Sequence, residues 1–298
     1  MLIDKKALFR RHYEIGFCRY YPAIVAYGTG YETKFVKNPP KDKWYADPFL
    51  FEVTDTSFVV LVEEFRYDYP VGRLAKLVVD RKTMKIVEEK IVLELSTHLS
   101  FPIYCRDGED VYVYPENSKS GSLNLYKYDK VGEQFVFQSC LVEDPLTDAV
   151  MLKWNRGEHY IFATDVRNEA GNNNELKIYR SDTIDGKYSL YQTVYFDRKT
   201  ARNGGAIIVI GGDYYRVAQD CTQSYGYSME FQKIKMDEKG QFSFETVSKV
   251  MPQGLQYGTH TFNVCGDWAV VDVNTAVYPL LRHIYFGASK RIKSIFSK

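Results

Sequence analysis

The chain has 298 residues, of which 45% are apolar and 26% charged, and its formal net charge is +1. These proportions are typical of a soluble globular protein and exclude a disordered chain, which would carry fewer apolar residues and a larger charge imbalance. A chain this close to neutrality has no global field that draws it to nucleic acid, so we expect no nucleic-acid partner.

Cysteine usage and hydropathy indicate the compartment. The five cysteines are scattered and form no Cys-x-x-Cys pair, which argues against a disulfide framework and against a zinc cluster. Residues 1–26 lack the pattern of a signal peptide, and no apolar run reaches the roughly 18 residues that span a bilayer. We therefore expect a cytoplasmic protein with no resident metal or cofactor.

The predicted elements begin with a strand at 13–18 and continue as a unit that recurs five times. Each unit opens with a short apolar strand, a polar turn and a second strand rich in aromatic and β-branched residues. In the first four units further strands follow, and units of four strands about every 50 residues are typical of propeller blades. The first strands are expected at 46–51, 99–104, 148–152, 205–209 and 259–264, and the second strands at 58–64, 111–116, 159–165, 214–220 and 268–272.

The last unit predicts how the ring closes. It ends early, near Asp272, while the strand at 13–18 has no neighbour in sequence to pair with. Unpaired strand edges are unfavourable, so the N-terminal strand should complete the last blade. We predict an all-β, five-bladed β-propeller over residues 1–280, with the N-terminal strand closing the last blade.

The C-terminal tail, 281–298, is basic. Within it, residues 286–298 carry four cationic residues, and apolar residues occur at helical spacing among them. Such a segment can lie on an anionic membrane surface, which would place the protein peripherally at the inner membrane face. The alternative is a solvated terminus. The residues concerned are Lys290, Arg291, Lys293 and Lys298, with Ile292, Ile295 and Phe296 between them.

Several short motifs resemble those of known propellers. Ala-Asp-Pro at 46–48 resembles the opening of the first blade in sugar-cleaving propellers of the arabinanase and invertase type. A closer resemblance is to the propeller domain on the N-terminal side of plant glucosamine inositolphosphorylceramide transferases, which also occurs beside bacterial formyltransferase-like proteins. It covers roughly residues 13–272 and is carried by 62–64, 98–102, 114–117, 202–206, 218–221 and 257–263, in order along the chain.

Polar residues near the first strands would line the central funnel of such a propeller. The candidates there are Asp47, His98, Ser100, Asp148, Arg202, Asn203 and His260, and the ends of the second strands add Glu63, Glu64, Glu116, Asp165 and Asp220. Carboxylates that share one funnel shift each other's pKa, as acid–base chemistry on a glycosidic bond requires. From these we predict catalytic roles for Asp47, Asp148, Glu116 and Asp220, and substrate binding by Glu64, His98, Arg202, Asn203 and His260.

The resemblance to arabinanases implies roles for some of these residues. Asp47 matches their general base, and Asp148 matches the aspartate that orients the substrate and tunes the acid. Their general acid is a glutamate early in the fourth blade, where this sequence has Arg202 and no glutamate. Glu116 or Asp220 could replace that acid if the geometry allows it.

Two residues have further alternatives. Some arabinanases hold a cation near the propeller axis with a histidine of the fifth blade, a position that His260 matches. The other interpretation of His260 is a side chain that hydrogen-bonds neighbouring strands. Arg202 has a planar fork of donors that suits a phosphate or carboxylate, and it predicts a funnel that binds anionic saccharides better than neutral ones.

Three functions fit the sequence. The first is an enzyme that cleaves or transfers a glycosyl unit in surface-polysaccharide or glycolipid biosynthesis, with a saccharide or glycolipid as substrate. The second is a non-catalytic carbohydrate-binding or scaffold propeller that serves a partner glycosyltransferase. The third, a protein-interaction propeller, is disfavoured because such a protein needs no cluster of carboxylates in its funnel. The missing glutamate of the fourth blade separates the first two only weakly.

Overall fold

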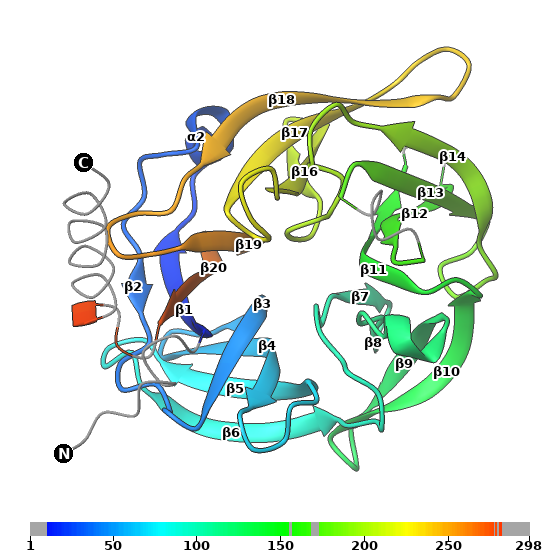
Figure 1. Ribbon diagram of the computed structural model, residues 1–298. Coiled ribbons are helices and arrows are strands. Elements are labelled where there is room, and N and C mark those ends of the chain that lie inside the picture. The colour runs from blue at the N-terminus through cyan, green and yellow to red at the C-terminus, as the bar shows by residue number, and fades with distance from the viewer. Residues whose placement is uncertain (1–10, 155–156, 168–172, 277, 279, 282–298) are drawn as a thin grey trace, which may run out of the picture.

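The computed structural model describes residues 11–154, 157–167, 173–276, 278 and 280–281. The chain is an all-β, five-bladed propeller, in which five four-stranded antiparallel sheets surround a central axis (Figure 1). Among the described residues, no helix is long and apolar enough to cross a membrane. The basic tail predicted at 281–298 lies outside the described residues, apart from Leu281.

Four blades are continuous in sequence, and each begins with the strand nearest the axis. Blade 1 contains β3 (Lys43–Val53), β4 (Ser57–Arg66), β5 (Arg73–Asp80) and β6 (Ile86–Leu93). Blade 2 contains β7 (Tyr104–Asp107), β8 (Asp110–Val113), β9 (Leu123–Asp129) and β10 (Gln134–Val142). Blade 3 contains β11 (Leu146–Lys153), β12 (His159–Asp165), β13 (Glu175–Ser181) and β14 (Ser189–Tyr195). Blade 4 contains β15 (Ile208–Ile210), β16 (Asp213–Asp220), β17 (Ser228–Met236) and β18 (Phe242–Val250).

The two ends of the chain build blade 5 together, which confirms the predicted closure. Its order is β19 (Gly258–Cys265), β20 (Trp268–Ala276), β1 (Arg11–Arg19) and β2 (Lys34–Phe35). Strand β1 pairs with β20 along its whole length. The N-terminal segment thus supplies two strands rather than one, with the short helix α2 (Pro22–Tyr27) between them.

Aromatic rings join neighbouring blades, which accounts for the high content of Tyr and Phe. Phe17 of blade 5 stacks on Phe58 of blade 1, with ring centroids 4.2 Å apart. Phe231 of blade 4 meets Phe262 of blade 5 edge to face at 5.2 Å. Burying large aromatic side chains between neighbouring sheets stabilises the propeller, because each blade covers the apolar face of the next.

Two inner strands are shorter than the sequence pattern predicts. Strand β7 begins only at Tyr104, because Phe101 has a left-handed φ of 48° and Pro102 has no N–H to donate. Strand β15 has three residues, because Gly204 and Gly205 pack against the backbone of β19 before it begins. The inner strands of blades 2 and 4 therefore line less of the axis than the other three.

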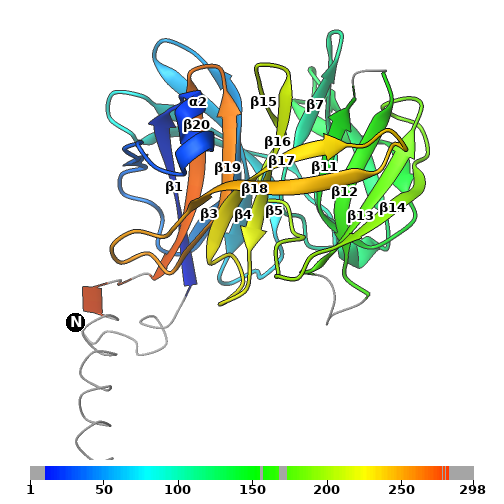
Figure 2. The same ribbon diagram turned by 90° about the horizontal axis from the view of Figure 1, so that it is seen from above.

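The two faces of the ring differ in what they carry, and Figure 2 shows the ring from the side. Inner strands begin at one face, which we call the funnel face, and second strands return to it. The hairpin turns from first to second strand and from third to fourth strand form the opposite face. Strand β20 ends at the funnel face, because it runs antiparallel to β19.

Candidate functional site

β-bulges aim the first side chains of the inner strands toward the axis. The register of β3 shifts between Ala46 and Phe49, and that of β11 shifts between Thr147 and Val150. Asp47 and Asp148 sit in these bulges with left-handed φ values of 49° and 48°. A non-glycine residue in this region is strained, and such strain is concentrated at functional sites.

Asp47, His260 and Asp272 form a buried cluster at the axis. Asp272 has no exposed surface, and its Oδ1 lies 2.8 Å from Nδ1 of His260 and accepts the Thr261 N–H at 3.0 Å. Its Oδ2 accepts the Asp47 N–H, also at 3.0 Å. Nε2 of His260 then faces Oδ1 of Asp47 at 3.8 Å. The histidine thus bridges the buried Asp272 and the carboxyl group that lines the funnel.

The charges of this cluster follow from burial. Burial alone would lower the pKa of His260, but the carboxylates of Asp272 and Asp47 outweigh it and raise that pKa to about 9. The pKa of Asp47 is raised well above its ordinary value, chiefly by burial, with Glu63 and Asp272 adding to the rise. At neutral pH we therefore expect a protonated His260 paired with an ionised Asp272, while burial favours the neutral form of Asp47.

The same three residues could offer a metal ion one ligand atom each, within 4.8 Å of one another. Metal binding would need an unprotonated histidine nitrogen and free carboxylate oxygens. Both oxygens of Asp272 already accept hydrogen bonds, and Nδ1 of His260 faces one of them. The donor set therefore fits an ion pair better than a metal centre.

Arg202 joins the second group of carboxyls. Its Nε lies 2.8 Å from Oδ2 of Asp148, and its Nη2 donates to the Thr147 hydroxyl at 2.8 Å and lies 3.7 Å from Oε2 of Glu116. The Thr147 hydroxyl in turn donates to Glu116. Nη1 of Arg202 makes no hydrogen bond or ion pair to any described residue. Burial raises the pKa of Asp148 to about 7, with Arg202 opposing and Glu116 adding to the rise.

A third pair completes the polar lining. Nε2 of His98 lies 3.1 Å from Oε1 of Glu63, while Nδ1 of His98 accepts the Gly72 N–H at 3.0 Å. Because Nδ1 accepts a hydrogen bond, the proton of the neutral ring is on Nε2 and faces Glu63. A Cβ at Gly72 would lie 2.3 Å from the carbonyl oxygen of Leu99, so only glycine allows this approach.

Aromatic side chains form the wall of a pocket of about 280 Å³ at the funnel face. Trp44 stacks on Phe65 at 4.7 Å, and Tyr13 stacks on His260 at 5.0 Å. Tyr225, which is 41% exposed, lies edge-on to His260 and covers the guanidinium of Arg202 at 5.0 Å. The pocket therefore combines flat apolar surfaces with a polar floor.

The structure brings together most of the residues predicted from sequence. Asp47, His98, Ser100, Glu116, Arg202 and His260 line the pocket, as does Glu63, and Asp148 lies beside Arg202. Four predicted residues lie elsewhere, and the first is Asp165, which pairs with Arg167 and Lys177. Glu64 pairs with Arg73 and Lys43 away from the pocket. Asp220 pairs with Arg198 and Lys249, and Asn203 is fully buried, donating to the carbonyl oxygens of Asp148 and Phe162.

Sequence reasoning did not assign a role to Tyr13, Trp44, Gly72, Tyr225 or Asp272. Asp272 was recognised only as the end of the fifth unit. Trp44 directly precedes the Ala-Asp-Pro motif, which is a signal that could have drawn attention to it. Tyr225 lies in the loop between β16 and β17, and nothing in its local sequence shows that this loop crosses the funnel.

Comparison with known proteins establishes the family. The family described as glucosamine inositolphosphorylceramide transferase 1, N-terminal, matches residues 33–265. The chain belongs to this family. It is 29% identical over 222 residues to glucosamine inositolphosphorylceramide transferase 1 of Oryza sativa subsp. japonica, and 26% identical over 216 residues to that of Arabidopsis thaliana. These matches cover 72% and 70% of this chain but 28% of each plant protein, so the chain spans little more than a quarter of their length.

Solved structures with a similar fold are glycoside hydrolases of family GH43. A β-1,3-galactosidase bound to galactodeoxynojirimycin superposes with a TM-score of 0.55 at 10% identity, covering 72% of this chain and 82% of that one. A β-xylosidase/α-arabinofuranosidase from a compost metagenome, bound to xylotriose, has a TM-score of 0.55 at 11% identity, covering 76% and 84%. At this level of identity the likeness shows the fold alone.

Proposed function

We propose that the chain binds a glycosyl unit in the funnel pocket, as part of glycolipid or surface-polysaccharide biosynthesis. The observation that carries the proposal is the aromatic wall beside polar atoms whose hydrogen-bonding capacity is only partly used. Oε1 of Glu63 faces only Nε2 of His98, Oδ1 of Asp47 faces only the distant Nε2 of His260, and Nη1 of Arg202 makes no hydrogen bond with the described residues. Sugar hydroxyls both donate and accept, so one ring could satisfy all three while its apolar face lies against Trp44 or Tyr225.

The size of the pocket supports a small ligand. Its volume of about 280 Å³ is near the lower end of the roughly 300–1,000 Å³ range of ligand pockets. That suits one glycosyl unit with the rest of a chain or lipid outside. The name of the plant relatives, glucosamine inositolphosphorylceramide transferase 1, supports a glycolipid, since it joins glucosamine to inositolphosphorylceramide.

Binding is supported better than hydrolysis. A general base must be ionised, whereas burial and neighbouring carboxyls raise the pKa of Asp47 well above its ordinary value. The position of the arabinanase acid holds Arg202, which cannot release a proton at neutral pH. We therefore place first a carbohydrate-binding propeller that serves a partner glycosyltransferase, in keeping with relatives whose chains extend far beyond the matched region.

Calorimetric titration with glucosamine, glucose and inositol phosphate tests the binding proposal. Asp47→Asn and Trp44→Ala should each weaken binding of the preferred ligand by roughly tenfold, the effect of losing one good hydrogen bond or one ring contact. Asp220→Asn is the matched control, because Asp220 pairs with Arg198 outside the pocket. Equal affinity in Asp47→Asn and wild type would contradict the proposal.

Catalysis is the second candidate, because the pKa of Asp148 is raised to about 7. A carboxyl poised near neutrality can donate or accept a proton during glycosyl transfer. Incubation with activated aryl glycosides should then release the aryl group with a rate that changes around pH 7. Asp148→Asn should abolish that release. A wild-type protein that binds sugars and releases nothing would leave binding as the function.

For location, we propose a cytoplasmic protein that contacts the inner membrane face through its basic tail. Strand β20 ends at the funnel face, and beyond it Leu280 and Leu281 are 60% and 41% exposed. A tail that binds anionic lipid would therefore start at the face of the propeller that carries the pocket. Cosedimentation with vesicles of phosphatidylcholine and phosphatidylserine should fall when residues 282–298 are removed. Unchanged sedimentation would contradict membrane contact through the tail.

A further inference from the structure

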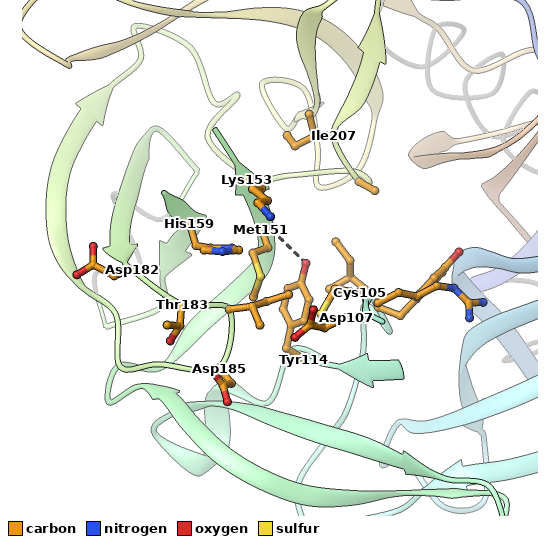
Figure 3. Close-up of a pocket in the computed structure, with 15 residues that line it drawn as sticks. Cys105, Asp107, Tyr114, Met151, Lys153, His159, Asp182, Thr183, Asp185 and Ile207 are labelled. Carbon is orange, nitrogen blue, oxygen red and sulfur yellow. Dashed lines mark hydrogen bonds between the residues drawn. The ribbon is translucent and has the colours of Figure 1, made fainter. Parts of the chain in front are cut away.

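A second, larger pocket opens at the opposite face of the ring. Its volume is about 560 Å³, and it lies between blades 2 and 3 close to the axis (Figure 3). The two short inner strands explain why space is left here, since β7 and β15 have four and three residues where β11 has eight. The pocket lies at the far end of β11 from Asp148. Lys153 lies five residues after Asp148 along the strand, or roughly 16 Å away at the rise of a β-strand.

The inner part of this pocket is apolar. Ile103, Met151 and Ile207 line it from three different blades, with Tyr114 beneath them. Tyr114 is 2% exposed, and its hydroxyl oxygen accepts the Met151 N–H at 3.1 Å. That hydrogen bond uses the oxygen as acceptor and leaves the phenolic hydrogen available to donate.

Two nitrogen-bearing side chains beside Tyr114 also lack partners. Nδ1 of His159 is a buried atom with no hydrogen bond. Lys153 is the cross-strand neighbour of His159 in the β11–β12 hairpin, and its ammonium makes no ion pair or hydrogen bond with the described residues. Figure 3 shows the His159 ring directed toward Met151, with Lys153 close to both. The Lys153 side chain is exposed, whereas a buried Nδ1 of His159 without a partner is costly, so the inner part of the cluster is incomplete without a ligand or water.

The acidic lining residues lie mainly at the edge of the pocket. Figure 3 shows Asp182 and Asp185 on its outer side, away from Met151. Both are exposed, Asp182 at 91% of its side chain, so water and salt screen their charges. Asp107 is also exposed, and it is the acidic group that lies electrostatically closest to His159. The inner end of the pocket therefore offers hydrogen-bond donors, and the exposed Lys153 supplies a positive charge beside them.

We propose that this pocket binds a small organic anion, with one carboxylate or phosphate group on a short apolar body. The anionic oxygens receive hydrogen bonds from Lys153, His159 and the Tyr114 hydroxyl, and the apolar body packs on Ile103, Met151 and Ile207. The site is separate from the funnel pocket and does not depend on the sugar-binding proposal. It gives the propeller a place for a second ligand at the face away from the funnel.

Three probes with the same six-carbon chain test the chemistry: hexanoate, hexyl phosphate and hexanamide. In amide NMR spectra of the full chain, at least one of the two anions should shift the signals of Met151 and Ile207 saturably. Hexanamide, which has the same shape as hexanoate but no charge, should bind roughly tenfold more weakly or not at all. The two anions separate a carboxylate site from a phosphate site.

Two variants test the residues. Lys153→Met and His159→Phe should each weaken binding of the favoured anion by roughly tenfold. Lys187→Met is the matched control, since Lys187 is 79% exposed near the same face and pairs with Glu143 outside the pocket. Asp148→Asn should leave anion binding unchanged. Equal binding of hexanamide and hexanoate, no binding of either anion, or full affinity in both pocket variants would overturn the proposal.

Discussion

Replacing Asp272 by asparagine tests the electrostatic account of the funnel. Asp272 is wholly buried and pairs with His260, whose pKa rises from an ordinary 6.5 to about 9. At about 1.36 kcal/mol for each pH unit, that rise represents about 3 kcal/mol of preference for the charged histidine. Asparagine removes this charge and also turns one acceptor into a donor, which leaves the Asp47 N–H or the His260 ring without an acceptor. We expect Asp272→Asn to lower the free energy of unfolding by about 3–5 kcal/mol.

Urea unfolding at pH 7 measures the loss, and ring NMR follows the titration of His260. The matched control is Asp68→Asn, whose ion pair with Arg66 is exposed to solvent and should leave the free energy of unfolding nearly unchanged. Because the pKa of His260 is raised in the folded state, its stabilising effect is full below about pH 6.5 and is lost as pH rises through about 9. The stability difference between wild type and His260→Gln should shrink over that window. A His260 that still titrates near pH 9 in Asp272→Asn would refute the reasoning.

Three further predictions address single residues. Gly72→Ala should lower the free energy of unfolding by about 1–3 kcal/mol, because the new Cβ would lie 2.3 Å from the Leu99 carbonyl oxygen. An unchanged melting temperature would contradict this and show that the backbone around Gly72 can move. The preference of the funnel for anionic saccharides stays a prediction. Calorimetric titration of wild type and Arg202→Ala with neutral and uronic saccharides tests it. Equal affinities for both classes of ligand would show that the Arg202 guanidinium only connects neighbouring blades. Burial raises the pKa of Cys105 to about 12, so iodoacetamide at pH 8 should alkylate it in urea but only slowly in the folded chain, as mass spectrometry will show.

The fold was predictable because the propeller repeats one simple unit. Period-two patterns and turn residues mark the hairpins, and five copies with an unpaired N-terminal strand leave few ways to close the ring. The pattern failed where the backbone departs from a regular strand. In blade 2 the segment predicted at 99–104 is mostly irregular, because the left-handed Phe101 and the following Pro102 interrupt the pairing.

The site was predictable by region and less so by residue, because successive residues of a strand point to opposite faces. Glu63 and Glu64 are adjacent in β4, yet Glu63 lines the pocket and Glu64 pairs with Arg73. In β16, Gln219 donates to Asp148, whereas its neighbour Asp220 turns outward to Arg198. The register of the strand decides which of two adjacent carboxyl groups points into the funnel. Composition and spacing alone do not distinguish one residue from its neighbour.

The bulges add a second reason, and they connect the fold to the proposed function. At Asp47 and Asp148 an extra residue in the inner strand rotates a carboxyl toward the axis, and both backbones adopt a left-handed φ. Such conformations cost about 1–3 kcal/mol each, which a purely structural strand would avoid. Arg202 then forms an ion pair with the second of these carboxyls. Strained, inward-facing carboxyls beside a cation that cannot release its proton at neutral pH favour the proposed sugar-binding role over the alternative of hydrolysis.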